Sequence, residues 1–192
     1  INRLAVKIAP VKTLEKFNAE TDHILAAPSD SGPVALLCVR PEEGQRLFPA
    51  TLELSVKRGA VGDNWEQGTW LSLKDGSPSP EVQVSILPKR IFDSICGGEN
   101  GIHPGDTVIA DLDLSENNLP VGQQLQLGTA IVQVSNVPNY GCSQWAERYG
   151  KDALRFVAQR DHRHHRLRGV LCRIVKDGFV SDEDSLSPIR KR

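Results

Sequence analysis

Long apolar segments are missing from this sequence, and no run approaches the roughly 18 residues that a transmembrane helix needs. The first residues include no basic segment followed by an apolar core, so we expect no secretory signal. An excess of charge is missing too: the formal net charge is -1, which argues against a broad surface for nucleic acid or acidic membranes. We therefore predict a cytoplasmic protein that binds neither nucleic acid nor a membrane.

Paired cysteines are also missing, because the four cysteines are widely spaced and form no CxxC motif. In a domain of this size without a secretion signal, such cysteines are expected to be reduced thiols. Cys38 and Cys172 lie inside apolar runs, and we interpret them as core residues. Cys96 precedes two glycines, and we expect it in an exposed loop.

Short apolar runs from residue 33 onward predict a mainly β fold with a few helices. A chain of 192 residues is long enough for one well-buried core and short for two, so we expect one domain. Apolar or alternating runs separated by Gly, Pro and Asn are typical of a barrel or a folded-over sheet. The predicted strands cover residues 34–39, 51–57, 81–87, 107–114, 124–134 (as one or two strands) and 170–175.

The two ends of the chain are predicted to flank this domain. We divide the chain into an N-terminal arm over 1–31, a domain over 32–180 and a C-terminal tail over 181–192. Leu14 and Phe17 fall at helical spacing, so the arm is expected to contain a short helix. Residues 178–192 are acidic and then basic, and we expect them to form a frayed tail.

The clearest helix is predicted to begin directly after Cys142. Ser143 is the expected N-cap, and Gly150 is expected to divide or kink the helical segment. A predicted strand over 130–134 comes before it, which places Cys142 at a strand-to-helix junction. The helix shows one broad apolar stripe, formed by Trp145, Ala146, Tyr149, Ala153, Phe156 and Val157.

The junction makes Cys142 the candidate reactive residue. A thiol at a helix N-terminus lies beside unpaired backbone N–H groups and the positive end of the helix dipole. This setting favours the thiolate, which is the nucleophile and the metal ligand. Gly141 allows a large group to approach the backbone closely. The alternative is a small buried residue at a turn, because free cysteine is often buried.

A basic run over residues 160–169 holds four arginines and three histidines. Arginine presents a planar fork of donors that suits phosphate, so a phosphorylated ligand near Cys142 is one interpretation. A solvated basic loop is the other. A histidine metal site and nucleic-acid binding have weaker support, since no spacing matches a zinc motif and few aromatic residues are interleaved.

Acidic residues offer fewer candidates. Asp63 and Asp106 lie in glycine-containing turns and would contribute to a site only if the fold brings them to Cys142. Asp111 and Asp113 alternate with apolar residues, so we expect both on one face of a strand. Paired carboxylates can perform acid–base catalysis, but on the wet face of a strand they are more often only solvated.

An ordered series of short motifs resembles the MOSC family, the domain found at the C-terminus of molybdenum-cofactor sulfurases and as free-standing proteins. The resemblance covers about residues 32–180 and has a cysteine at its centre. The segments that carry it are Arg40-Pro41, Gly62-Asp63-Asn64-Trp65, Gln83-Val84-Ser85-Ile86, Gly105-Asp106-Thr107-Val108, residues 111–122, Leu127-Gly128, Pro138-Asn139-Tyr140-Gly141-Cys142, Glu147-Arg148-Tyr149-Gly150 and Arg166-Leu167-Arg168-Gly169.

The resemblance implies a MOSC-type β-barrel with a few helices and a molybdenum cofactor (molybdopterin). In family members that bind this cofactor, the matching cysteine is a metal ligand and basic residues hold the pterin phosphate. Carried onto this chain, Cys142 would be the molybdenum ligand or the sulfur carrier. Arg166 and Arg168 would bind the phosphate, and Arg40 and Asn139 are further cofactor-binding candidates from the same motifs.

Three functions fit these residues. In the first, Cys142 ligates molybdenum in an oxidoreductase that reduces a small N-hydroxylated substrate. In the second, Cys142 is a non-catalytic carrier that accepts sulfur as a persulfide and passes it on during assembly of the cofactor or a metal–sulfur cluster. In the third, Cys142 is structural in a binding module. The sequence shows no desulfurase domain and no ferredoxin-like cysteines, so we expect sulfur or electrons to come from a sulfur-donor protein or an external redox partner.

Overall fold

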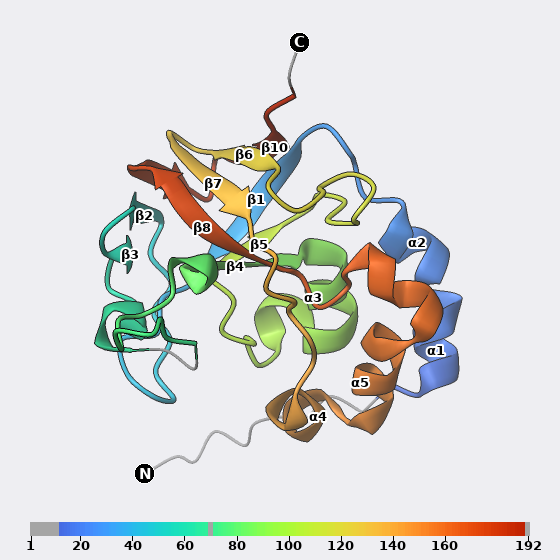
Figure 1. Cartoon of the computed structure of the whole chain (residues 1–192). Helices are drawn as coiled ribbons and strands as arrows, with labels where there is room; N and C mark the ends of the chain where they lie inside the picture. The colour runs from blue at the N-terminus through green and yellow to red at the C-terminus, as the bar shows by residue number, and fades with distance from the viewer. Residues whose placement is uncertain (1–11, 69–70, 191–192) are drawn as a thin grey trace.

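Alternating apolar residues form seven strands that close into a barrel in the order β1-β10-β6-β7-β8-β4-β5 (Figure 1). The computed structural model describes residues 12–68 and 71–190, so residues 1–11 of the expected arm and residues 191–192 of the expected tail lie outside the described residues. The barrel strands are β1 (Gly32–Leu37), β4 (Val84–Pro88), β5 (Val108–Ala110), β6 (Gln124–Leu127), β7 (Ala130–Val134), β8 (Val170–Lys176) and β10 (Ser185–Pro188).

Neighbouring barrel strands are antiparallel, with the exception of the parallel pair β4 and β5. Closure pairs every barrel strand on both sides and so leaves no free edge that could recruit another chain. A separate three-stranded sheet has the order β3-β2-β9 and lies beside the barrel. Its strands are β2 (Thr51–Ser55), β3 (Gly59–Ala60) and β9 (Gly178–Ser181). The predicted mainly β fold with a closed barrel is therefore confirmed.

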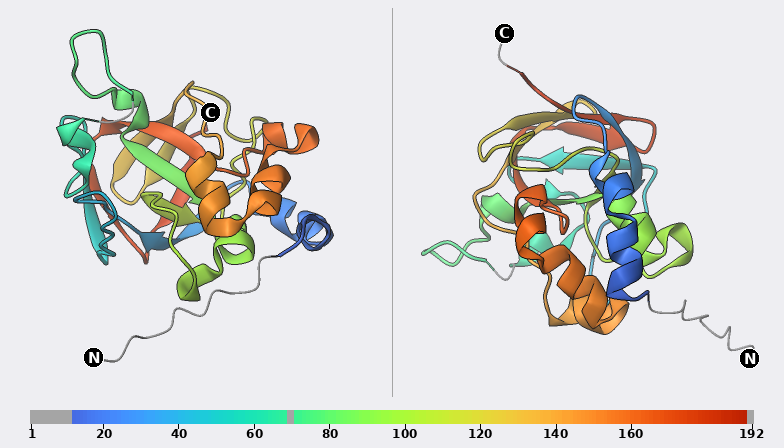
Figure 2. Two further views of the ribbon diagram at one scale, coloured as in Figure 1. Left: turned by 90° about the horizontal axis from the view of Figure 1, so that it is seen from below. Right: turned by 90° about the vertical axis from the view of Figure 1, so that its right-hand side faces the viewer.

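The helices gather on one side of the barrel, away from β2 and β3 (Figure 1). The right-hand view of Figure 2 shows α1 beside α5, with the strands above them. Gly150, with φ of 91°, separates α4 from α5, as expected from the sequence. The α-helices are α1 (Leu14–Ala19), α2 (Thr21–Leu25), α3 (Lys89–Cys96), α4 (Ser143–Tyr149) and α5 (Lys151–Ala158), and the 3-10 helices are η1 (Asn64–Gln67), η2 (Pro80–Val82), η3 (Gly98–Asn100) and η4 (Arg160–His165).

Strands β4 and β5 connect two apolar cores, because successive side chains of a strand point to opposite faces. Ile86 and Val108 belong to the core inside the barrel. Leu87 and Ile109 belong to a second core shared with the helices, in which the rings of Phe17 and Phe156 stack at 5.6 Å. Trp145 of α4 is buried in this second core. The helix that follows Cys142 is thus packed against the outside of the barrel.

Three sequence expectations about local structure are wrong. The strand expected over 107–114 is limited to β5, because Asp111 forms an ion pair with Arg90 (2.9 Å) and Asp113 accepts a hydrogen bond from the backbone of Ser115. These two carboxylates are therefore held in structural contacts. Cys96 is not in an exposed loop, since it ends α3 and is 3% exposed. The frayed tail expected over 178–192 instead forms β9 and β10 through residue 188.

No helix among residues 12–68 and 71–190 is long and apolar enough to cross a membrane.

The burial of Leu186 leads to a prediction about β10. Leu186 is fully buried between β1 and β6. Leu186→Ala should lower the free energy of unfolding by about 2–5 kcal/mol, because truncating a core leucine loses buried contacts and leaves a cavity. Urea denaturation would measure this loss. Ile189→Ala is the matched control, since Ile189 is 39% exposed and follows the same strand. Equal, small effects of the two variants would contradict the place of β10 in the barrel.

Candidate functional site

Cys142 is presented at the end of a loop that is fixed to the barrel. The backbone N–H of Ser135 donates to the carbonyl of Leu171 (2.9 Å), and the Asn139 side-chain amide donates to the carbonyl of Arg168 (3.1 Å). The expected N-cap, Ser143, is wrong by one residue: Cys142 is the N-cap of α4, and its side chain makes no capping hydrogen bond. The thiol is therefore not engaged by the helix that it precedes.

Exposure distinguishes Cys142 from the other three cysteines. Cys142 is exposed, whereas Cys38, Cys96 and Cys172 are buried. Burial raises the pKa of the Cys38 thiol to about 11, and it raises the pKa of the Cys96 and Cys172 thiols to about 12. These three residues are therefore protonated core side chains near neutral pH. The interpretation of Cys38 and Cys172 as core residues is confirmed, and a buried position for Cys142 is excluded.

A cavity of about 480 Å³ adjoins Cys142, and we call it the thiol cavity. It brings together four of the five residues selected from the sequence: Arg40, Asn139, Cys142 and Arg168. The fifth, Arg166, does not line it and instead faces a neighbouring cavity. Asp106, Trp145 and Arg148 also line the thiol cavity.

Arg168 joins three parts of the thiol cavity wall. One of its terminal nitrogens lies 2.9 and 3.0 Å from the two carboxylate oxygens of Asp106. Its guanidinium carbon also lies 4.6 Å from the centre of the Trp145 ring, a cation–π contact. The Asp106 side chain is 2% exposed, so this ion pair is almost completely desolvated. Arg168 thus connects the segment that precedes β8 to the segment that precedes β5 and to α4.

Gly169 sets the position of Arg168. It has φ of 91°, and a Cβ atom at this position would lie 2.1 Å from the carbonyl oxygen of Ile86. Only glycine fits such a close approach of two backbones in this conformation. The chain therefore enters β8 directly against β4, with Arg168 at the cavity wall.

Arg40 is held by a second carboxylate. Its Nε and one Nη donate to the two oxygens of Asp63 at 3.0 and 3.2 Å, and its backbone N–H donates to the same carboxylate at 2.9 Å. The Asp63 side chain is 2% exposed. Asp63 and Asp106, which the sequence placed in turns, are thus each the partner of a cavity arginine. Both carboxylates therefore hold arginines at the cavity wall.

His103 supports the loop that carries Gly105 and Asp106. Its Nδ1 accepts a hydrogen bond from the backbone N–H of Gly105 at 3.0 Å. Burial lowers the pKa of His103 to about 4, so the ring is neutral at neutral pH. The rings of Phe48 and Phe92 contact it at 5.2 and 5.4 Å. The imidazole therefore acts as a packed acceptor that fixes this edge of the cavity.

Sequence reasoning missed Arg148 as a cavity residue. Arg148 lines the thiol cavity and donates one hydrogen bond to the carbonyl of Pro104 at 2.9 Å. The available signal was its place in the Glu147-Arg148-Tyr149-Gly150 segment, one of those that carry the family resemblance.

The histidines of the basic run form contacts within and beside η4. His162 is buried, and its Nδ1 lies 2.8 Å from the carbonyl of Phe156. The rings of His164 and His165 contact each other with centroids 3.9 Å apart. In the part of the chain that the structure describes, no group of three or more His, Cys, Asp or Glu residues could hold a metal ion.

Comparison with solved structures identifies the class of fold. YuaD from Bacillus subtilis is similar with a TM-score of 0.62 and 16% identity, over 84% of this chain and 97% of that chain. YiiM from Escherichia coli is similar with a TM-score of 0.54 and 17% identity, over 84% of this chain and 71% of that chain. YiiM from Geobacillus stearothermophilus is similar with a TM-score of 0.53 and 16% identity, over 83% of this chain and 75% of that chain.

YuaD and YiiM are MOSC-domain proteins, so these similarities support a MOSC-like fold for this chain. At these levels of identity the likeness establishes the fold alone. No protein-family model matches the chain, and no curated protein matches it in sequence.

The difference in burial predicts the reactivity of the four thiols. The folded protein should react rapidly with one equivalent of 5,5′-dithiobis(2-nitrobenzoic acid) near neutral pH, through exposed Cys142. After unfolding in urea, all four cysteines should react. Absorbance of the released thiolate measures both amounts. Cys142→Ser should abolish the rapid reaction of the folded protein and leave three thiols that react after unfolding. A second rapidly reacting thiol in the folded protein would contradict the assignment of Cys142 as the one exposed cysteine.

Proposed function

We propose that this chain binds a molybdenum cofactor in the thiol cavity, with Cys142 as metal ligand, and reduces small N-hydroxylated compounds. The observation that carries this proposal is the position of one exposed thiol at a cavity whose wall holds three arginines. A thiolate is a suitable soft ligand for such a metal, and arginine is suited to a phosphate group.

The charge of the cavity wall fits an anionic cofactor. Arg40, Arg148 and Arg168 line the wall. Asp63 and Asp106 are the ion-pair partners of Arg40 and Arg168, so Arg148 is the wall arginine without an acidic partner among the described residues. The ion pair with Asp106 uses one Nη of Arg168, and the bond to the Pro104 carbonyl uses one Nη of Arg148. The ion pair with Asp63 uses Nε and one Nη of Arg40. Each guanidinium is therefore oriented by the protein while at least one N–H group is left over. Oriented, spare donors of this kind suit a phosphate group.

Trp145 provides a second observation in favour of a bound polar group. Its Nε1 is buried and has no hydrogen-bond partner among the described residues, although the residue lines the thiol cavity. An unpaired buried donor costs about 1–3 kcal/mol.

The chain's own residues would bind and orient the reactants. When bound, the cofactor would supply two-electron redox chemistry. Cys142 would hold it through sulfur, Arg40, Arg148 and Arg168 would hold its phosphate, and Asn139 would keep the loop in place through its bond to Arg168. The net reaction breaks the N–O bond of the substrate, consumes two electrons and two protons, and releases water and the reduced amine. The electrons would come from an external redox partner.

Metal analysis of the protein would test this proposal. When it is expressed in a host that makes molybdenum cofactor, the protein should contain close to one molybdenum atom and one pterin per chain. Cys142→Ala should lose most of the molybdenum, because the variant lacks the ligand sulfur. Arg148→Gln should retain the fold but lower the molybdenum content several-fold, since the variant loses one charged contact to the cofactor phosphate and hydrogen bonds to charged groups contribute about 1.5–3 kcal/mol.

Ser143→Ala is the matched control, because Ser143 is an exposed neighbour of Cys142 on the same helix. It should retain the molybdenum content of the unaltered protein. Equal molybdenum in the protein and in Cys142→Ala would contradict Cys142 as ligand. Absence of molybdenum from both would favour the alternative below.

The alternative is that Cys142 carries sulfur as a persulfide, without catalysis, during assembly of molybdenum cofactor or a metal–sulfur cluster. The exposure of Cys142 favours this function, because a sulfur-donor protein can reach the thiol directly. The attack of the thiolate on a donor persulfide would transfer one sulfur atom and release the donor thiol.

Mass spectrometry would test the carrier function. After incubation with a cysteine desulfurase and cysteine, Cys142 should gain the mass of one sulfur atom, and a reductant should remove it. Cys142→Ser should gain nothing. The buried Cys38, Cys96 and Cys172 serve as internal controls, since the donor cannot reach them. Unmodified Cys142 under these conditions would contradict the carrier function.

A further inference from the structure

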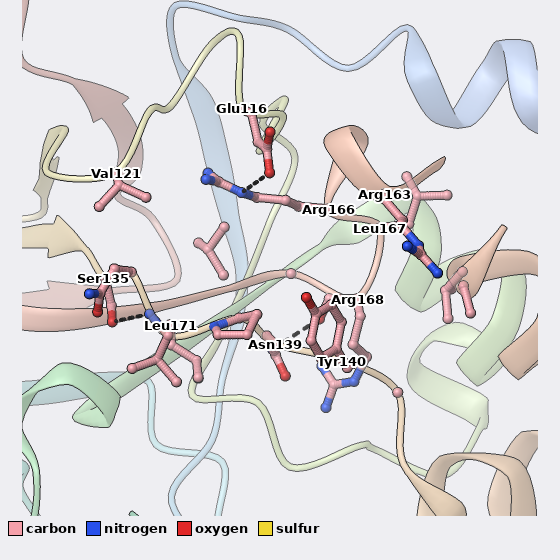
Figure 3. A pocket seen from close by; sticks show the side chains of 18 residues that line it. Glu116, Val121, Ser135, Asn139, Tyr140, Arg163, Arg166, Leu167, Arg168 and Leu171 are labelled. Atoms are coloured by element: carbon pink, nitrogen blue, oxygen red, sulfur yellow. Dashed lines mark hydrogen bonds and ion pairs between the residues drawn. The ribbon is translucent and has the colours of Figure 1, made fainter. Parts of the chain in front are cut away.

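A second, larger cavity of about 720 Å³, whose lining Figure 3 shows, lies next to the thiol cavity. The two cavities share a wall that includes Asn139, Tyr140 and Arg168, but Cys142 lines only the thiol cavity. We call the second one the arginine cavity, because Arg163 and Arg166 line it and do not line the other. Its volume lies within the range of roughly 300–1,000 Å³ that is typical of small-molecule sites.

Buried apolar side chains form much of the lining of the arginine cavity. Leu167, Val170, Leu171 and Val157 line it and are each at most 7% exposed. They belong to packed cores, so this surface is preformed. Figure 3 shows Leu167 and Leu171 on opposite sides of the space. Such a lining favours a ligand with an apolar body.

Tyr140 adds an aromatic surface at the edge of the cavity. It is 74% exposed and follows Pro138 and Asn139, which also line the cavity. An exposed aromatic ring next to an apolar lining can stack against a planar ring of a ligand. The apolar body that fits best is therefore aromatic.

The charge of the cavity wall is positive. The exposed side chain of Arg163 makes no hydrogen bond or ion pair within the part of the chain that the structure describes. Arg166 donates to the carbonyl of Leu119 at 2.6 Å and lies 3.8 Å from the carboxylate of Glu116. Arg168 is neutralised by Asp106. The wall thus keeps one cation without a partner and a second with a distant, 59% exposed partner.

The backbone of Arg166 has an unusual, left-handed conformation. Among the described residues, Arg166 is the only non-glycine with positive φ, at 50°. A left-handed conformation costs a residue with a Cβ roughly 1–2 kcal/mol, whereas glycine adopts it freely. Strain of this kind is concentrated at ligand-binding sites. Arg166 is the C-cap of η4, and its side chain lies half-buried at the cavity wall.

We propose that the arginine cavity binds small aromatic anions: a planar ring that packs on the apolar lining and carries a carboxylate or phosphate group that pairs with Arg163. This site is distinct from the thiol cavity and independent of the function proposed for Cys142. Anion and ring are recognised by different residues, so each part of the ligand can be tested separately.

Isothermal titration calorimetry on the full chain would test the proposal. The ligands are 2-naphthoate, 2-naphthyl phosphate and the neutral 2-naphthalenemethanol. The anions should bind at least about tenfold more tightly than the alcohol, because charge-assisted hydrogen bonds contribute more than neutral ones. The comparison of the two anions identifies the preferred group. Equal affinity for the alcohol, or no binding of any ligand at millimolar concentration, would overturn the proposal.

Arg163→Gln separates the anion contact from the apolar contact. Its guanidinium has no partner among the described residues, so the fold should be unaffected. The variant should bind the two anions about tenfold more weakly and the alcohol with unchanged affinity. Arg160→Gln is the matched control, because Arg160 is an exposed arginine of the same 3-10 helix that does not line the cavity. Equal effects of the two variants would contradict the proposal.

Cys142→Ala keeps this test separate from the molybdenum test. The variant should bind 2-naphthoate with unchanged affinity, since Cys142 does not line the arginine cavity. Conversely, Arg163→Gln should keep the molybdenum content of the unaltered protein. Loss of 2-naphthoate binding in Cys142→Ala would place the ligand in the thiol cavity and overturn the proposal.

Discussion

The buried ion pair between Arg168 and Asp106 connects the three segments that form the thiol cavity. Arg168 precedes β8, Asp106 precedes β5, and the guanidinium covers the ring of Trp145 on α4. Removing one partner would leave the other charge buried without compensation, which is far more costly than losing a surface pair. Arg40 and Asp63 form a second pair, in which the carboxylate is buried and the arginine is partly exposed. The cationic wall thus depends on carboxylates that fix the arginines and leave some of their donors available.

Most of the barrel could be predicted from the sequence, because alternation within a strand is a local signal. Strands β1, β6, β7 and β8 follow apolar patterns that their own residues display. β10 could not be predicted in this way. Its one buried apolar side chain, Leu186, stands among serines in an acidic and basic stretch, and its burial is decided by β1 and β6, which are distant in sequence.

The candidate site shows the same division between local and non-local information. Cys142 could be selected from its strand-to-helix junction alone. Arg166 and Arg168 are two residues apart in one motif, yet Arg168 lines both cavities and Arg166 only one. The backbone is left-handed at Arg166 and approaches β4 closely at Gly169, directly beside the two arginines. Neither can be read from residue spacing, because both depend on contacts with other segments.

The pairing of β1 with β10 also constrains how the chain folds. Gly32 pairs with Leu186, so the barrel closes by joining segments from nearly opposite ends of the described chain. Contacts between such distant segments are formed late and slowly, since much chain entropy is lost before they contribute. Until β10 docks, β1 and β6 each present an unpaired edge. Refolding at high protein concentration therefore carries a risk of aggregation through these edges.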